Sequence, residues 1–317
     1  MIRNILKMFV MFAWMLLPAT AWSAEQPSPQ VVVSIKPVHS LVAGIMAGAG
    51  SPMLLIKGGA SPHGYALRPS EAHALNQARL IIWVGPELES FLEKSLGSIG
   101  KDAQQLRLAE SMSNLLLPAR AGGNWEEEND QSDHSHASHL EEGIDPHLWL
   151  GPAQAKRITE LAVVALSEAD PANRDLYRAN GKKLQQRLEA LQLELAEKLA
   201  PVVDVPYMVF HDAFQYFEHA FGLNVVGSVT LNPERGPGIR RILEIRNRIQ
   251  QLGARCVFSE PQFEPRLIAT VIEDTDAATG TLDPIGADLP EGADTYFLLM
   301  RNLADALSEC LAEADNS

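Results

Sequence analysis

The sequence predicts an α/β protein made of two doubly wound parallel-sheet lobes that are joined by one long rigid helix. Short apolar runs alternate with segments of helical periodicity, which is the pattern of a parallel sheet covered by helices. One long segment, residues 171–201, keeps helical periodicity throughout, and the alternation of strands and helices begins again after it. A chain of 317 residues is long enough for two such lobes.

The N-terminus has the features of a secretory signal peptide over residues 1–24. Arg3 and Lys7 precede an apolar stretch at 8–17, and Ala19-Thr20-Ala21 is a cleavage signal of the A-x-A type. The apolar stretch is short for a membrane-spanning helix, and no cysteine lies near the cleavage signal to carry a lipid. We therefore expect a protein exported to the periplasm, with the position of cleavage left open.

Residues 25–170 are predicted to form the N-terminal lobe. Strands are expected at 31–36, 53–56 and 80–85, because these runs are short and apolar. The intervening segments VHSLVAGIMAG and RPSEAHALNQA have the appearance of helices, and Ser70 is a suitable N-cap for the second.

A segment of different character, residues 121–142, interrupts this lobe. Its sequence, AGGNWEEENDQSDHSHASHLEE, is acidic, rich in Gly, Asn and Ser, and without apolar periodicity. Such a segment buries too little apolar surface to order itself. We expect a mobile surface loop.

The predicted linker helix, 171–201, and the C-terminal lobe, 202–317, follow. The helix keeps leucines at steps of three and four residues and has prolines near both ends. The expected elements of the C-terminal lobe are strands at YMVF and CVFSEP, a helix around 237–252 and a final helix at 293–312.

Cys256 and Cys310 are the two cysteines of the chain. In an exported protein an even pair of cysteines usually forms a disulfide. We expect such a bond here, with a structural role, because two cysteines this far apart make a poor metal site by themselves.

The formal net charge of -14 argues against a nucleic-acid partner. Binding to nucleic acid needs a basic surface that neutralises phosphates, and no basic stripe is visible in the sequence. An acidic protein is compatible with attracting a cation, but acidity alone does not decide this.

Four polar residues are expected at the edge where open α/β sheets bind ligands: three follow strand-like runs, and one, in DPHLWL, lies between the acidic loop and the next helix. They are His63, His147, His211 and Asp283. Three imidazoles and one oxygen ligand make an ordinary four-coordinate Zn²⁺ site. Because two candidates precede the long helix and two follow it, the metal would lie in the cleft between the lobes. The alternative for each histidine taken alone is a hydrogen-bonded structural role.

Six motifs occur in order from residue 30 to the C-terminus: GASPHGYALRPSE, DPHLWLGP, VFHDAFQYFEHAFGL, NPERGPGIRRI, CVFSEPQF and GTLDPIGAD. Together they resemble the substrate-binding proteins of high-affinity zinc-uptake ABC transporters, in which a rigid helix joins two lobes. The resemblance implies a protein, expected to be a monomer without enzymatic activity, that captures Zn²⁺ as the transported ligand. It would deliver the ion to an inner-membrane ABC permease with its cytoplasmic ATPase.

The resemblance also implies a set of ligands. His63, His147 and His211 match the three histidine ligands of the family, and Asp283 matches an aspartate that completes the metal shell in many relatives. Some zinc-binding members have an acidic residue where this chain has Pro62. The fourth ligand is therefore Asp283 or water. Manganese-binding relatives typically have a glutamate at the position of His211, so His211 favours zinc.

The remaining histidines are given other roles. His134, His136 and His139 lie in the acidic loop, which by the same resemblance gathers metal weakly or receives it from a partner such as a periplasmic zinc chaperone. A solvated polar insertion is an equal alternative. His39, His73 and His219 are interpreted as structural or surface residues, and Glu260 is a candidate for orienting a ligand imidazole.

Three other functions compete with zinc delivery, and the last of them, a metal-dependent adhesin or surface lipoprotein, is disfavoured because the chain has no lipobox cysteine. A manganese or other divalent-metal binding protein of the same transporter class is the first. A secreted zinc hydrolase is the second, and it is disfavoured because the chain has neither an H-E-x-x-H motif nor a G-x-S-x-G motif.

Overall fold

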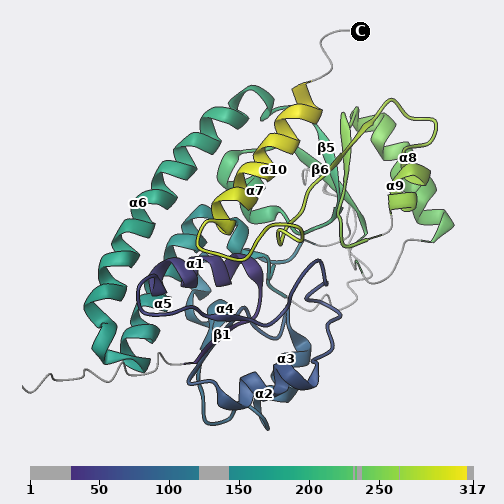
Figure 1. The fold of residues 1–317 in the computed structure, drawn as a ribbon. Coiled ribbons are helices and arrows are strands. Elements are labelled where there is room, and N and C mark those ends of the chain that lie inside the picture. The colour runs from purple at the N-terminus through teal and green to yellow at the C-terminus, as the bar shows by residue number, and fades with distance from the viewer. Residues whose placement is uncertain (1–29, 121–142, 231–232, 234–237, 264, 313–317) are drawn as a thin grey trace, which may run out of the picture.

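The computed structural model describes residues 30–120, 143–230, 233, 238–263 and 265–312. Two four-stranded parallel sheets form two lobes, and one long helix, α6 (Arg174–Leu199), runs along both of them (Figure 1). The predicted fold class is confirmed. The proposed signal peptide, 1–24, and the acidic loop, 121–142, lie outside the described residues. None of the helices in the described part is long and apolar enough to span a bilayer.

The N-terminal lobe has the strand order β2-β1-β3-β4, with all neighbours parallel. The bounds are β1 Val31–Val33, β2 Met53–Leu54, β3 Leu80–Trp83 and β4 Gln104–Arg107. The first three are shorter than predicted. β4 was not predicted, because its sequence QQLR contains no apolar run; its edge position allows it to stay partly exposed.

Helices cover both faces of this sheet, which explains why β1 and β3 are buried throughout. Alternate strand residues pack with α1 (Lys36–Met46) and α5 (Pro152–Ala169) on one face. The others pack with α2 (Pro69–Gln77) and α3 (Ser90–Leu96) on the opposite face. A one-turn helix, α4 (Leu108–Ser111), follows β4.

The start of α2 differs from the prediction. Arg68 and not Ser70 is the N-cap residue, and Pro69 is the first helical residue, a position that suits its fixed φ and missing N–H. The Glu71 carboxylate accepts a hydrogen bond from the Arg68 backbone N–H at 2.8 Å. The prediction of Ser70 as cap was wrong because Pro69 sets the start of the helix.

The C-terminal lobe repeats this arrangement with the order β6-β5-β7-β8, again all parallel. The bounds are β5 Tyr207–His211, β6 Val225–Thr230, β7 Cys256–Ser259 and β8 Ala278–Thr281. One face of the sheet packs with α8 (Ile239–Leu252) and α9 (Pro265–Ile272). The other packs with α7 (Gln215–Phe221) and α10 (Thr295–Ala312).

Helix α6 joins the lobes through a single apolar face. Leu184, Leu188, Leu191 and Leu195 are buried in a core cluster that contains residues of both sheets. On the outer side, Arg301 of α10 forms a two-pronged ion pair with Glu194 of α6, with both N–O distances at 2.7 Å. Because the core continues from one lobe to the other, their relative position is held by packing.

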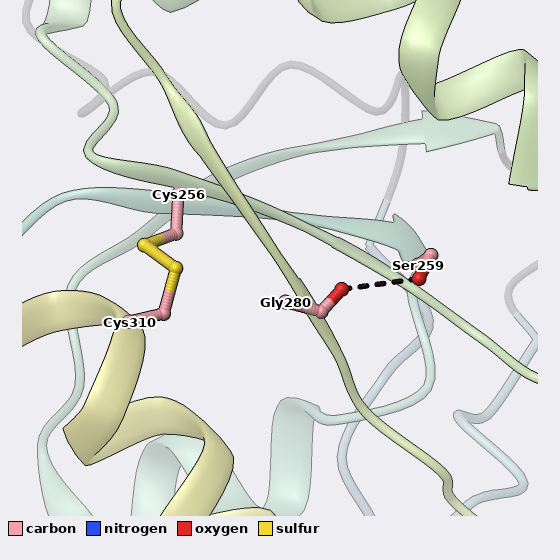
Figure 2. Close-up of a disulfide and its surroundings, with 4 residues drawn as sticks. All are labelled: Cys256, Ser259, Gly280 and Cys310. Carbon is pink, nitrogen blue, oxygen red and sulfur yellow. Dashed lines mark hydrogen bonds between the residues drawn. A yellow bond between two sulfur atoms is a disulfide. The ribbon is translucent and has the colours of Figure 1, made fainter.

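The expected disulfide is confirmed. Figure 2 shows the bond between Cys256, at the start of β7, and Cys310, near the end of α10. Nearby, the Ser259 hydroxyl donates a hydrogen bond to the Gly280 carbonyl at 3.0 Å and so ties β7 to β8. The bond closes a chain segment with a sequence separation of 54, which staples the last helix to the sheet of its lobe.

Reducing this disulfide should lower the free energy of unfolding by about 4 kcal/mol, because the reduced unfolded chain regains loop entropy. For a protein of this size the melting temperature would fall by roughly 6–7 °C. Calorimetry of the oxidised and reduced protein measures the shift, and Cys310→Ser should reproduce it. Two reactive thiols in the unfolded but unreduced protein would contradict the assignment.

Candidate metal centre

Three histidines from separate segments converge between the lobes. His63 lies in the loop between β2 and α2, His147 directly precedes a 3₁₀ turn at Leu148–Leu150, and His211 is the last residue of β5. Each provides one ring nitrogen, and these nitrogens all lie within 4.8 Å of one another. The group forms at the carboxyl ends of strands, where open α/β sheets bind ligands.

The spacing of the ring nitrogens fits a tetrahedral zinc ion. His147 Nε2 lies 3.2 Å from His63 Nε2 and 3.4 Å from His211 Nε2. Zn–N bonds of about 2.0–2.1 Å at tetrahedral angles place two nitrogen ligands about 3.3–3.4 Å apart. The protein therefore holds His147 Nε2 at the distances from His63 Nε2 and His211 Nε2 that a tetrahedral zinc ion requires.

The Asp145 carboxylate binds the Nδ1 side of the His147 ring, opposite the side that faces the centre. The His147 Nδ1–H donates to Asp145 Oδ1 at 2.8 Å, and the His147 backbone N–H donates to the same oxygen at 2.9 Å. The proton is placed on Nδ1 because a carboxylate accepts hydrogen bonds, which leaves the Nε2 lone pair facing the centre. Burial raises the pKa of Asp145 to about 7, against the effect of the His147 amide.

His211 has an equivalent partner. Glu260 Oε1 accepts hydrogen bonds from the His211 ring Nδ1–H at 2.5 Å and from its backbone N–H at 3.2 Å. Glu260, considered above as a residue that orients an imidazole, therefore holds His211 with Nε2 directed at the other two rings. Burial opposes a charge on His211, but the adjacent Glu260 carboxylate raises the pKa of this histidine.

His63 and His147 are kept neutral. Burial and the neighbouring His147 and His211 rings lower the pKa of His63 to about 2. Burial, followed by the charge of His211, holds the pKa of His147 well below its usual value. Neutral imidazole is the form that binds metal, so both rings are ready to act as ligands near neutral pH.

Asp283 is not part of this group among the described residues. Its Oδ1 accepts hydrogen bonds from the Gln262 Nε2–H at 2.8 Å and from two backbone amides, and its Oδ2 accepts from the Ala287 amide at 2.5 Å. The turn that it caps includes Gly286 at φ +68°, a conformation that favours glycine. Asp283 shapes the wall beside the histidines, and its role as fourth ligand remains a prediction.

The pocket at the centre is small, with a volume of about 10 Å³, about that of one water-sized sphere. Trp149, Phe263, Pro284 and Ile285 form its apolar walls. The Trp149 Nε1–H donates to the Pro284 carbonyl at 2.7 Å and fixes one wall against another. The space between these walls is of a size that suits a single ion.

Lys36 fixes the same wall from the N-terminal lobe. Its buried ammonium donates to the carbonyls of Gly286, Ala287 and Leu289 at 2.6, 2.8 and 2.9 Å. The ammonium therefore directs all three of its N–H donors to carbonyls of residues 286–289 in the C-terminal lobe. Sequence reasoning missed Lys36 and Asp145; for Asp145 a signal was present, since it lies two residues before a candidate histidine in DPH.

The other histidines stay apart from the centre. His39 is buried, and one of its ring nitrogens is hydrogen bonded to the Pro52 carbonyl at 3.0 Å; His73 and His219 are exposed on α2 and α7. The loop histidines His134, His136 and His139 lie outside the described residues.

The fold and the three convergent imidazoles define a metal-binding protein of the two-lobed class with a linking helix. The family model described as ZnuA, zinc-uptake complex component A, periplasmic, matches residues 31–310. The chain belongs to this family. A high-affinity zinc uptake system protein ZnuA from Brucella suis is 44% identical over 310 residues, covering 89% of this chain and 92% of the relative. Its counterpart from Yersinia pestis is 38% identical, with 90% and 92% covered.

Solved structures share the fold at lower identity. One described as the crystal structure of ZnuA is 23% identical, with a TM-score of 0.74, and covers 90% of this chain and 99% of that one. The protein FpvC from Pseudomonas aeruginosa, solved with Mn²⁺, is 20% identical with a TM-score of 0.77 and the same coverage. At this identity the likeness supports the architecture alone.

Replacing Asp145 should weaken zinc binding through His147. We expect Asp145→Ala to lower zinc affinity by roughly 10–100-fold, as is typical when a hydrogen-bond partner of a metal ligand is lost. Asp145→Asn should recover most of this loss, because an amide oxygen also accepts from Nδ1–H. Titration against a chromophoric chelator measures both; equal losses in the two variants would exclude the orienting role.

Proposed function

We propose that the protein captures Zn²⁺ in the periplasm as cargo and delivers it to an inner-membrane ABC permease with a cytoplasmic ATPase. The observation that supports this most strongly is the convergence of His63, His147 and His211. The two nitrogen–nitrogen distances from His147, 3.2 and 3.4 Å, match those between ligands of a tetrahedral zinc ion. Membership of the zinc-uptake family supports the same conclusion. His63 and His147 precede α6 and His211 follows it, so the ion binds where the two lobes meet.

The donor set favours zinc over manganese. Imidazole nitrogens suit zinc, whereas manganese prefers carboxylate and other oxygen ligands. His211 supplies a third nitrogen, and the four hydrogen bonds on Asp283 hold that carboxylate in its own turn. Between the two fourth ligands considered, Asp283 and water, this arrangement supports water.

A binding role without catalysis is also part of the proposal. The pocket has a volume of about 10 Å³, which suits an ion as the bound species. A catalytic zinc site needs an open position that a substrate can reach. We infer that the protein acts as a monomer that carries the ion and leaves it unchanged.

We also propose functions for the acidic loop and for the N-terminus. Residues 1–24 would direct export, and His134, His136 and His139 would receive zinc from a partner such as a periplasmic chaperone. The ends of the loop support this role. The Ala119 amide donates to the Gly143 carbonyl at 2.9 Å, two residues before Asp145. Ions gathered by the loop would therefore arrive beside the centre.

Zinc should stabilise the native protein strongly, because it binds the folded state. At 1,000 times the dissociation constant the gain is about 4 kcal/mol. We expect His63→Ala and His211→Ala to abolish most of the zinc-induced shift in melting temperature. His219→Ala is the matched control, since His219 is exposed on α7, and it should keep the full shift. In competition, zinc should displace manganese at equal concentration.

These measurements separate the alternatives. Loss of the shift in His134→Ala, with the shift kept in His63→Ala and His211→Ala, would identify the acidic loop as the receptor. Displacement of zinc by manganese would favour the manganese-binding alternative.

Deleting residues 125–142 should leave one tight zinc site and remove weaker additional binding. The three converging histidines all lie outside this segment. Isothermal titration calorimetry of the full and shortened proteins counts both classes of site. A shortened protein that folds but has lost its tight site would show that the loop contributes a ligand.

A further inference from the structure

One turn of the C-terminal lobe, residues 283–289, is bound by two side chains of the N-terminal lobe. Pro284 and Ile285, near its start, line the metal pocket. The Trp149 Nε1–H donates to the Pro284 carbonyl at 2.7 Å. The Lys36 ammonium donates to three further carbonyls of the same turn, those of Gly286, Ala287 and Leu289. The N-terminal lobe therefore fixes this wall of the pocket directly.

Lys36 is a buried cation that binds backbone oxygens. Its exposed fraction is 5%. Burial lowers the pKa of its ammonium, and the charge of Asp283 opposes this effect. Hydrogen bonds donated by a charged group are stronger than neutral ones, and three of them converge on one short segment. Lys36 is the first residue of α1 and closely follows β1, so its side chain stands on a firmly packed part of the N-terminal lobe.

The 283–289 turn is closed on itself by its own hydrogen bonds. The Asp283 carboxylate accepts from the amides of Ile285, Gly286 and Ala287, which leaves the carbonyls of the turn for donors of the N-terminal lobe. The loop that leads to His63 also approaches closely, because a Cβ at Gly59 would lie 3.2 Å from the Ala287 Cβ. A shift of the turn as one body would therefore move the pocket wall away from the histidines and from this loop.

The position of this wall bears on how fast a bound ion leaves. Water must replace the histidine ligands as the ion departs, and a wall that moves away from them admits water. We propose that Lys36 is a positioning residue that slows the release of zinc by holding the 283–289 turn beside the three histidines. It acts through the turn and does not contact the ion. This inference rests on the three-histidine site of the proposed function.

Lys36→Met tests the proposal, because it removes the ammonium and keeps an unbranched apolar side chain. We expect zinc release to accelerate by about tenfold or more, since one hydrogen bond to a charged group is worth about that factor. Stopped-flow mixing of the zinc-loaded protein with excess chromophoric chelator measures the rate. Hydrogen exchange at the amides of residues 285–287 should also accelerate in the metal-free variant, because the turn opens more often.

Ser40→Ala is the matched control, because it removes a different buried hydrogen bond between the lobes. The Ser40 hydroxyl, on α1 like Lys36, accepts from the Tyr296 amide at 2.9 Å, away from the 283–289 turn. This variant should lower the melting temperature and leave both zinc release and the exchange of the turn unchanged. If it accelerated release as much as Lys36→Met, the effect would be one of general stability and the proposal would fail.

Trp149→Phe removes the second donor to the turn and keeps an aromatic wall, so it provides a milder test. We expect zinc release to accelerate by about threefold, since a neutral hydrogen bond contributes less than a charged one. When it is combined with Lys36→Met, the two effects should not simply multiply, because both act on one turn. Lys36→Met combined with Ser40→Ala should show independent effects.

The outcomes separate this inference from the function on which it rests. A wild-type rate of zinc release in both Lys36→Met and Trp149→Phe would overturn the role of Lys36 and leave the three-histidine site intact. A wild-type protein that binds no zinc would instead refute the proposed function.

Discussion

The structure depends on holding three imidazoles close together, with His147 Nε2 3.2 Å from His63 Nε2 and 3.4 Å from His211 Nε2. The Nε2 lone pairs of the three rings point toward one another and do not attract each other. If two adjacent rings were protonated, two positive charges would be in contact. Each ring must therefore be fixed by something other than its neighbours. Asp145 and Glu260 do this for His147 and His211, and in doing so leave the Nε2 lone pairs for a cation.

The three histidines can be placed precisely only if the two lobes keep a fixed position relative to each other. One core cluster runs through both sheets and along α6. Helix α10 packs on α1, where the Ser40 hydroxyl accepts a hydrogen bond from the Tyr296 amide at 2.9 Å. Lys36 binds three carbonyls of the other lobe. The three histidines thus come from separate lobes, and one continuous core holds these lobes in a fixed relative position.

The wall of the pocket explains how a protein with many carboxylates presents a nitrogen-rich centre. The chain has 40 Asp and Glu residues, and carboxylates flank each side of the pocket. Each of those discussed has a hydrogen-bond partner: Asp145 and Glu260 accept from imidazoles, and Asp283 accepts from the amides of its own turn. A donor set of three imidazole nitrogens suits a nitrogen-preferring metal, and each of these carboxylates makes at least one hydrogen bond away from the centre.

The sequence alone predicted the parallel α/β lobes, the linker helix and the disulfide pair, and it singled out the three histidines that the structure brings together. These features follow from local periodicity, from compartment and from motifs, and each is visible in a short stretch of residues. β4 and the N-cap of α2 were missed or wrong, because an edge strand needs no apolar run and Pro69 overrode a good capping residue.

Only the tertiary structure decided which polar groups serve the centre. Lys36 and the carbonyls that it binds are separated by about 250 residues, and no local pattern connects them. The same holds for Glu260 and His211, and for Asp283 and Gln262, whose pairing depends on how strand ends meet. Long-range hydrogen bonds are set by the register and packing of whole elements, so a one-dimensional pattern cannot assign them.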